Sequence, residues 1–273
     1  MHVLVTNDDG IESDGLWALA DAAARLGSVT VVAPHVDQSG QSVSIRLRHP
    51  VAVQRRLVGR PGDAQAPYAT FAVEASPATC VLLACGRLAH QPFDLVLAGI
   101  NHGANVASDI WLSGTVGAAR MGSLLGIPAL AVSVDHDRRT HDGSLYWADI
   151  ASIAAELGRG LVSHAQPLLL NLNVPNQPCA ALGGLLATAV SLRSRIAASQ
   201  VLEVDPSVYS VRFQPWAAHL AEPGSDLWAL DHGLASVSLL TPHPSDAPAL
   251  DLAALCGRVS RDLGITLAGA SRV

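Results

Sequence analysis

The sequence predicts an α/β protein with a Rossmann-like, mostly parallel sheet that is flanked by helices. Short apolar runs that suit buried strands alternate with segments whose apolar residues recur at helical spacing. Polar loops that contain glycine follow several of these runs, as they do in βαβ units. At 273 residues, of which 49% are hydrophobic and 15% charged, the chain is long enough to bury a large core.

The N-terminal half supplies the first of these strands and helices. The strand expected at 2–6 leads into an acidic turn, and a helix with apolar spacing over 16–26 follows. A second buried strand is expected at 29–34, and shorter β-like pieces at 50–53 and 69–73.

The middle of the chain continues the alternation. Ser76 and Pro77 have the residue types of a helix N-cap and first helical position. Further strands are expected at 94–100, 128–134 and 168–174, and further helices at 116–125 and 147–161.

The pattern changes after Pro175, where prolines cluster and the strand-like pieces 187–190 and 208–213 stand apart. We therefore expect residues 1–175 to form the Rossmann-like core that binds metal and phosphate. Residues 176–273 are expected to form a C-terminal, β-rich extension with a hairpin, an exchange segment and a closing helix over 246–263.

Composition excludes several kinds of chemistry. All 17 basic residues are arginine, so the chain has neither a P-loop lysine nor a lysine for a Schiff base. The net charge of −6 gives no general attraction for duplex nucleic acid. The four cysteines are scattered, and no apolar run approaches the roughly 18 residues of a membrane span. We expect a cytoplasmic protein without a membrane partner.

Two adjacent carboxylates, Asp8 and Asp9, lie where the first strand ends. Ligands of open parallel sheets bind beyond the carboxyl ends of the strands. Paired aspartates repel each other unless a positive charge lies between them, and a hard divalent cation meets that need. The alternative is that both residues only cap the next helix, whose N-terminus favours negative charge.

Oxygen-bearing side chains follow two other strands. Ser39 lies after the second strand and Asn101 ends the strand of 94–100. Carboxylate, hydroxyl and amide oxygens suit Mg²⁺ or Mn²⁺ better than zinc. As alternatives, Ser39 is an ordinary loop hydroxyl and Asn101 caps a turn.

Ser113-Gly114-Thr115 is the start of a predicted helix, where unpaired N–H groups and the helix dipole favour an anion. A metal site beside such a phosphate cradle, in a chain without lysine, indicates phosphoester hydrolysis. The alternative is that Ser113 is an N-cap without a ligand.

The chain resembles the SurE family of stationary-phase survival proteins, which are metal-dependent nucleotidases. The segments that carry this resemblance are Val5–Ile11 with Ser13 and Gly15, Ala33-Pro34 with Gln38–Gly40, Gly99–Gly103 with Asn105, Ser113–Val116 and Leu170–Pro175. Weaker similarity continues through Ser225-Asp226, Ala229, Gly233 and Ser236.

The resemblance implies one divalent cation, Mg²⁺ or Mn²⁺, per subunit on Asp8, Asp9, Ser39 and Asn101. It also implies hydrolysis of nucleoside 5′- and 3′-monophosphates and, in some members, exopolyphosphatase activity. We expect Asp8 and Asp9 to be catalytic, and Asn105, Ser113, Gly114 and Thr115 to contact the phosphate. The family forms dimers or tetramers by exchanging C-terminal segments, so we expect self-association.

The chain departs from the family pattern at Thr79, Met121 and Ser238–Leu240, none of which is a proposed ligand. Two other classes of protein open with an acidic strand end. A haloacid-dehalogenase-type phosphatase has its second aspartate where this chain has Gly10, and a receiver-like Mg²⁺-binding module needs a lysine that this chain lacks.

Overall fold

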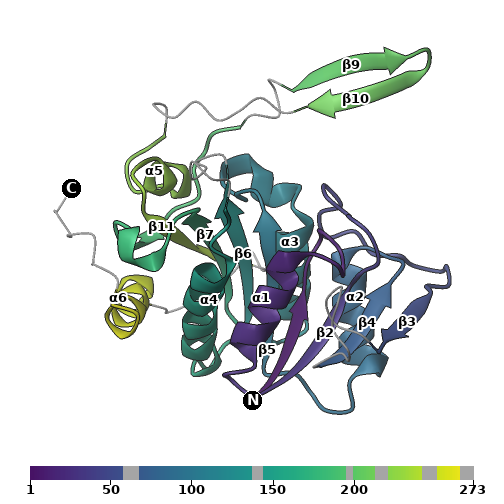
Figure 1. Cartoon of the computed structure of the whole chain (residues 1–273), viewed down its shortest axis with the longest axis horizontal. Helices are drawn as coiled ribbons and strands as arrows, with labels where there is room; N and C mark the ends of the chain where they lie inside the picture. Colours follow the sequence, from purple (N-terminus) through teal and green to yellow (C-terminus); the bar gives the residue numbers. More distant parts are fainter. Residues whose placement is uncertain (58–67, 137–143, 195–198, 213–220, 242–250, 265–273) are drawn as a thin grey trace.

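A nine-stranded sheet forms the centre of the computed structural model, which describes residues 1–57, 68–136, 144–194, 199–212, 221–241 and 251–264. The strand order is β3-β4-β2-β1-β5-β6-β7-β11-β8 (Figure 1). The strands are β1 (His2–Thr6), β2 (Ser28–Pro34), β3 (Val53–Arg56), β4 (Ala69–Val73), β5 (Leu95–His102), β6 (Ala129–Asp135), β7 (Leu169–Pro175), β8 (Leu185–Thr188) and β11 (Ala235–Leu240).

Six of these strands run parallel to one another, which confirms the predicted fold class. Strands β4, β2, β1, β5, β6 and β7 pair in parallel, whereas β3 and β11 are antiparallel to their neighbours β4 and β7. The chain builds outward from β1 through β2 to β4 and then returns to place β5 on the other side of β1. The reversal makes the carboxyl ends of β1 and β5 the switch point where ligands bind in open α/β sheets.

Helices cover both faces of the sheet (Figure 1). The α-helices are α1 (Asp14–Ala23), α2 (Pro77–Leu83), α3 (Gly114–Leu124), α4 (Trp147–Val162), α5 (Asp226–Asp231) and α6 (Leu252–Asp262). A π-helical turn η1 (Ala84–Leu88) and the 3₁₀ turns η2 (Ala107–Trp111) and η3 (Cys179–Ala181) complete the helical elements of the described residues.

Each face of the sheet has its own core. On β1, Val3 and Val5 pack into the cluster that contains α1, α4 and α6, whereas Leu4 packs into the cluster of α2 and α3. Alternate side chains of a strand point to opposite faces, so a strand covered on both sides is apolar throughout. That is why the central strands could be predicted from continuous apolar runs.

The segment after Pro175 contributes to two separate sheets. Strands β8 and β11 belong to the main sheet, whereas β9 (Gln200–Asp205) and β10 (Val208–Arg212) form an antiparallel hairpin of their own. The hairpin projects from the body of the molecule (Figure 1). The predicted domain boundary at residue 175 stays a prediction, and positions 246–250 of the predicted closing helix lie outside the described residues.

The structure also describes the cysteines and the longest apolar helices. All four cysteines lie within the described residues and are free. No helix in the described ranges is long and apolar enough to cross a membrane. The expected cytoplasmic location stays a prediction.

The start of α1 lies tightly against the end of β5. A Cβ atom on Gly15 would lie 2.4 Å from the carbonyl oxygen of Ile100, well inside van der Waals contact. Only glycine therefore allows this approach, which brings the loop after β1 close to the end of β5.

We predict that Gly15→Ala destabilises the protein by about 2–3 kcal/mol, as overpacking of a close contact does. Alanine has a higher helix propensity than glycine by about 1 kcal/mol, so any loss of stability in Gly15→Ala must come from the clash with Ile100. Urea unfolding measures the change, with Gly86→Ala as the control because a Cβ there meets nothing within 4 Å. Equal stability of Gly15→Ala and wild type would contradict the close approach.

Candidate metal and phosphate site

The carboxylate pair lies at the switch point of the sheet. Asp8 and Asp9 come directly after β1, and Asn101 lies at the end of the neighbouring strand β5. The structure thus brings the polar ends of these two strands to the same edge, as the sequence predicts from parallel pairing.

Asp8 is buried, with 3% of its surface exposed, and is held by the N-terminus of α3. The hydroxyl of Thr115 donates to its Oδ1, and the backbone N–H of Thr115 also donates to the carboxylate. A Cβ on Gly114 would lie 2.8 Å from Asp8 Oδ2, so glycine is needed for helix and carboxylate to meet. Burial raises the pKa of Asp8, and these hydrogen bonds lower it in part.

Asp9 has a raised pKa and one carboxylate oxygen that accepts no hydrogen bond from the described residues. Burial and then the charge of Asp8 raise its pKa to about 7, and a backbone N–H bond from His102 partly opposes the shift. Its Oδ2 atom is buried and finds no hydrogen-bond partner among the described residues, and the same holds for Thr6 Oγ1 and Asn7 Oδ1. Buried polar oxygens normally have partners, so the unpartnered Asp9 Oδ2 indicates a ligand.

Ser39 is held on its loop by a residue that the sequence analysis missed. Asp37 Oδ1 accepts from both the backbone N–H of Ser39, at 2.7 Å, and its hydroxyl, at 2.6 Å. Because Ser39 donates its hydroxyl proton to Asp37, its Oγ keeps its lone pairs as acceptors. The charge of Asp37 also raises the pKa of Asp8 and Asp9, which places it close to the pair.

The amide of Asn101 is oriented in a comparable way. Its Nδ2 donates to the carbonyl oxygen of Gly103 at 2.6 Å, so this bond uses the amino side of the amide and leaves Oδ1 as the acceptor. The residue that follows, His102, donates its backbone N–H to Asp9, and the residue before Ser39, Gln38, donates its own to the carbonyl of Asp8 at 2.7 Å. The loops that carry Ser39 and Asn101 therefore contact the carboxylate pair through the neighbouring residues Gln38 and His102.

These oxygens fit a hard divalent cation. The site offers two carboxylates, a hydroxyl and an amide oxygen, and it contains no sulfur or ring nitrogen among the predicted ligands. A cation would also offset the burial and the repulsion from Asp8 that keep the pKa of Asp9 high. The assignment of Asp8, Asp9, Ser39 and Asn101 to a metal stays a prediction.

The start of α3 has a different arrangement from the predicted phosphate cradle. Ser113 Oγ accepts from the backbone N–H of Val116 at 3.0 Å and is thus the N-cap of α3. Thr115 has both its hydroxyl and its N–H on Asp8. The anion at this helix terminus is therefore the Asp8 carboxylate, and contacts of Ser113, Gly114 and Thr115 with phosphate stay a prediction.

Asn105 is held by buried polar side chains of β6 and β7. Its backbone N–H donates to Asn173 Oδ1 at 2.7 Å, and its carbonyl accepts from Asn171 at 2.8 Å and Asn173 at 3.1 Å. Its own Nδ2 donates to Ser133 Oγ at 2.9 Å. The signal for these supports was present in the sequence, because two asparagines interrupt an apolar strand that is buried on both faces.

Asp226 joins the C-terminal part of the chain to the loop beside the site. It is fully buried, and its two carboxylate oxygens accept from the backbone N–H groups of Ala107, Ser191 and Leu227, at 2.8–2.9 Å. Its position in the weakly similar segment Ser225-Asp226 was the only sequence signal for this role.

Comparisons with known proteins find relatives that align with most of the chain. The sequence model of the family described as "Survival protein SurE" matches residues 3–197. The 5′-nucleotidase SurE of Aeromonas hydrophila subsp. hydrophila is 37% identical over 245 residues, which cover 88% of this chain and 92% of the relative. The 5′-nucleotidase SurE of Geobacter sulfurreducens is 39% identical over 208 residues, covering 76% and 74%.

A solved structure shares the fold. The crystal structure of the SurE protein from Aquifex aeolicus matches with a TM-score of 0.72 and 31% sequence identity, over 90% of this chain and 95% of that one. The likeness therefore extends along most of both chains.

The raised pKa of Asp9 predicts how the metal-free protein responds to pH. A carboxyl with a raised folded pKa binds its proton more tightly in the folded than in the unfolded state. Its contribution to stability is therefore present below the unfolded value of 3.8 and is lost as pH rises through about 7. Relative to Asp9→Asn, wild type should lose on the order of 4 kcal/mol between about pH 4 and pH 8.

Denaturant unfolding with a chelator present measures this difference at each pH. Asp205→Asn, on the exposed hairpin, is the control for removal of one carboxylate. A stability difference between wild type and Asp9→Asn that does not change with pH would show that Asp9 ionises as readily folded as unfolded.

Proposed function

The chain belongs to the SurE family, and from this premise we propose that it is a divalent-metal-dependent nucleotidase. It hydrolyses nucleoside 5′- and 3′-monophosphates to nucleoside and phosphate. The names of the relatives, 5′-nucleotidase SurE, support the activity. The observation that carries the metal dependence is the pair of buried Asp8 and partly buried Asp9 at the switch point, with Asp9 Oδ2 lacking a protein partner among the described residues.

Asp8, Asp9, Ser39 and Asn101 would hold the cation. When bound, Mg²⁺ or Mn²⁺ supplies positive charge that offsets the carboxylate pair and stabilises negative charge on the phosphoryl oxygens. Ser39 and Asn101 contribute oxygens whose orientation is set by Asp37 and Gly103.

The two carboxylates have different roles because their hydrogen bonds differ. Thr115 holds Asp8 with two donors, so Asp8 is a fixed anion at the helix N-terminus. Asp9 keeps an unused oxygen, and we assign it as the acceptor of the proton that the attacking water loses.

The phosphoryl oxygens need donors on the other side of the site. The N–H of Gly114 is at the first position of α3 and has no partner within the helix. The hydroxyl of Ser113 accepts from Val116 and keeps its own proton to donate. With Asn105 nearby in the chain and rigidly held, these groups are the proposed contacts for phosphate.

A phosphate-release assay on AMP with Mn²⁺, compared with the same assay in a chelator, tests the proposal. We expect release that depends on the metal. Release at equal rates with and without chelator would contradict metal dependence, and no release from any nucleoside monophosphate would contradict the nucleotidase assignment.

Asp8→Asn should strongly reduce turnover while leaving the fold intact. Asparagine keeps the shape of the side chain and an oxygen for Thr115 but removes half of the charge of the pair. Several kcal/mol of attraction for the cation are then lost, so we predict a fall of about 10³-fold in AMP turnover and little thermal shift with Mn²⁺.

The metal-free Asp8→Asn protein should unfold at or above the wild-type temperature, because the repulsion between positions 8 and 9 is gone. Differential scanning fluorimetry with and without Mn²⁺, with Asp205→Asn as the control, measures both effects. If asparagine served as well as aspartate, as a helix cap would, activity would survive and the site assignment would fail.

The β9–β10 hairpin is the proposed means of self-association into dimers or tetramers. Its apolar side chains are exposed in the single chain, including Val204 at 67% and Val211 at 63%. Exposed β-hairpins with apolar side chains pair readily with another chain.

Light scattering should give a dimer or tetramer for wild type at micromolar protein, and Val204→Glu with Val211→Glu should shift it toward monomer. The exposed positions make a loss of folding unexpected, which circular dichroism checks. An active wild-type monomer at that concentration would refute exchange through the hairpin.

A further inference from the structure

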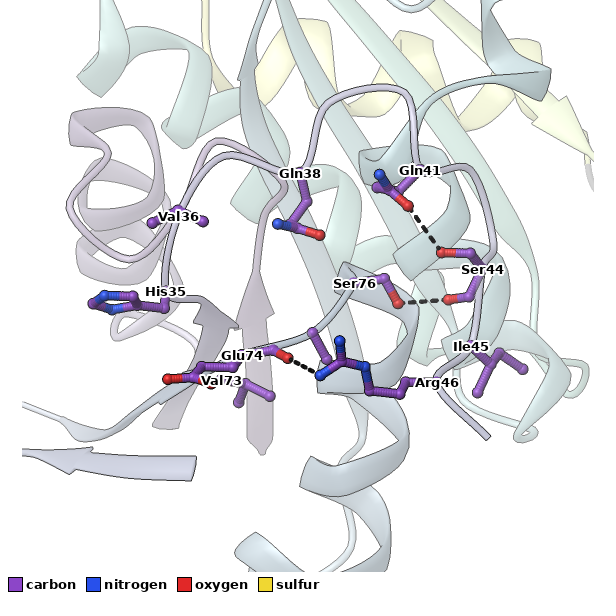
Figure 2. A pocket seen from close by; sticks show the side chains of 11 residues that line it. His35, Val36, Gln38, Gln41, Ser44, Ile45, Arg46, Val73, Glu74 and Ser76 are labelled. Atoms are coloured by element: carbon purple, nitrogen blue, oxygen red, sulfur yellow. Dashed lines mark hydrogen bonds between the residues drawn. The ribbon is translucent and has the colours of Figure 1, made fainter. Parts of the chain in front are cut away.

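A cavity of about 490 Å³ lies beside the carboxylate pair, between the loop after β2 and the turn from β4 to α2. Small-molecule sites have volumes of about 300–1,000 Å³, so the cavity is large enough for a nucleoside. Figure 2 shows its lining, which comprises His35, Val36, Gln38, Gln41, Ser44, Ile45, Arg46, Val73, Glu74, Ala75 and Ser76.

The cavity adjoins the candidate metal site through a shared loop. Gln38 lines the cavity, and its backbone N–H donates to the carbonyl of Asp8 at 2.7 Å. Ser39, a proposed ligand, lies on the same loop between the cavity residues Gln38 and Gln41. A molecule with its phosphate at the metal site would therefore reach the cavity past this loop.

Hydrogen bonds hold the walls of the cavity in place. Arg46 Nη1 donates to the carbonyl of Glu74 at 3.2 Å, and Ser76 Oγ donates to the carbonyl of Ser44 at 2.5 Å (Figure 2). The backbone N–H of Arg46 donates to Thr79 Oγ1 at 3.1 Å. Thr79, one of the departures from the family pattern, thus supports the wall that presents Arg46.

The chemistry of the lining matches a nucleoside. The side chains of Gln38 and Arg46 point toward the same central space (Figure 2), and carboxamides both donate and accept hydrogen bonds, as the edges of nucleobases do. Guanidinium planes also stack on flat rings. Val36 and Ile45, which are exposed, supply apolar surface for the face of a base.

We propose that this cavity binds the nucleoside part of the substrate, with Arg46 as a specificity-determining residue. The proposal rests on the nucleotidase function above and adds a choice of substrate class. The lining has one arginine and one glutamate, Arg46 and Glu74, which cancel in charge. A chain of phosphates would need several uncompensated cations, so the cavity favours a nucleoside monophosphate over polyphosphate.

A cluster of aromatic rings near the carboxylates is the alternative binding place for the base. The rings of His102 and His136 stack with their centroids 4.2 Å apart, and Trp147 lies 6.3 Å from His102. None of the three residues lines the cavity, so the two places are separate and variants can distinguish them.

The test compares Arg46→Ala with wild type on AMP and on p-nitrophenyl phosphate, which lacks a nucleoside. We expect the KM for AMP and the inhibition constant of adenosine against p-nitrophenyl phosphate to rise together by about tenfold. The kcat for p-nitrophenyl phosphate should not change. Arg25→Ala is the matched control, because Arg25 also makes a side-chain hydrogen bond, to Ser152, but follows α1 at the other end of that helix.

Arg46 also donates a hydrogen bond to the backbone carbonyl of Glu74, so its loss could disturb the fold as well as binding. A second variant that keeps Arg46 separates the two effects. Val36→Trp fills the cavity from an exposed position and should produce the same selective loss for AMP and adenosine. Unchanged AMP kinetics in both variants, or equal losses on both substrates, would overturn the assignment. A selective loss in His102→Ala instead would place the base on the histidine side.

The outcome also separates this inference from the function on which it rests. A wild-type protein that releases no phosphate from AMP would overturn both the nucleotidase function and the nucleoside cavity. A wild type that hydrolyses AMP with the same KM as both cavity variants would overturn the cavity alone.

Discussion

The rest of the site depends on two adjacent carboxylates, of which Asp8 is buried and Asp9 is partly buried. Asp8 and Asp9 lie together at the end of the central strand, where burial raises the pKa of both and the charge of Asp8 raises that of Asp9 further. Such a pair is costly to keep ionised without a cation, and a protein with a merely structural turn would have no reason to retain it. Carboxylates with strongly shifted pKa values are concentrated at functional sites, where their charge takes part in binding or catalysis.

The surrounding loops are arranged to hold this pair while leaving oxygens available. Thr115 fastens Asp8 to the N-terminus of α3, so one carboxylate is rigid. Ser39 donates its hydroxyl proton to Asp37, and Asn101 donates its amide N–H to the carbonyl of Gly103. The acceptor oxygens of Ser39 and Asn101 are thereby left available for a cation. The supports come from two connections of the sheet, Asp37 from the one after β2, and Gly103 and Thr115 from the one after β5. The site therefore depends on the strand order, because only adjacent parallel strands bring these loops together.

Much of this arrangement could be predicted from local patterns, and the rest depends on contacts between distant segments. The central strands and the edge that carries Asp8 and Asn101 follow from apolar runs that end in polar turns. The sequence could not show that β11 inserts between β7 and β8, since strand order depends on pairing between remote segments. Nor could it show that Thr115 donates to Asp8, because a helix N-terminus accepts a side-chain carboxylate as readily as a phosphate.

The central claim is that Asp8 and Asp9 hold one divalent cation, and anomalous scattering from crystals grown with Mn²⁺ tests it most directly. The account predicts one anomalous peak per subunit, about 2.0–2.4 Å from oxygens of both aspartates, with Ser39 and Asn101 around the same ion. A fully active protein whose crystals show no peak there, or whose manganese lies away from both carboxylates, would contradict it.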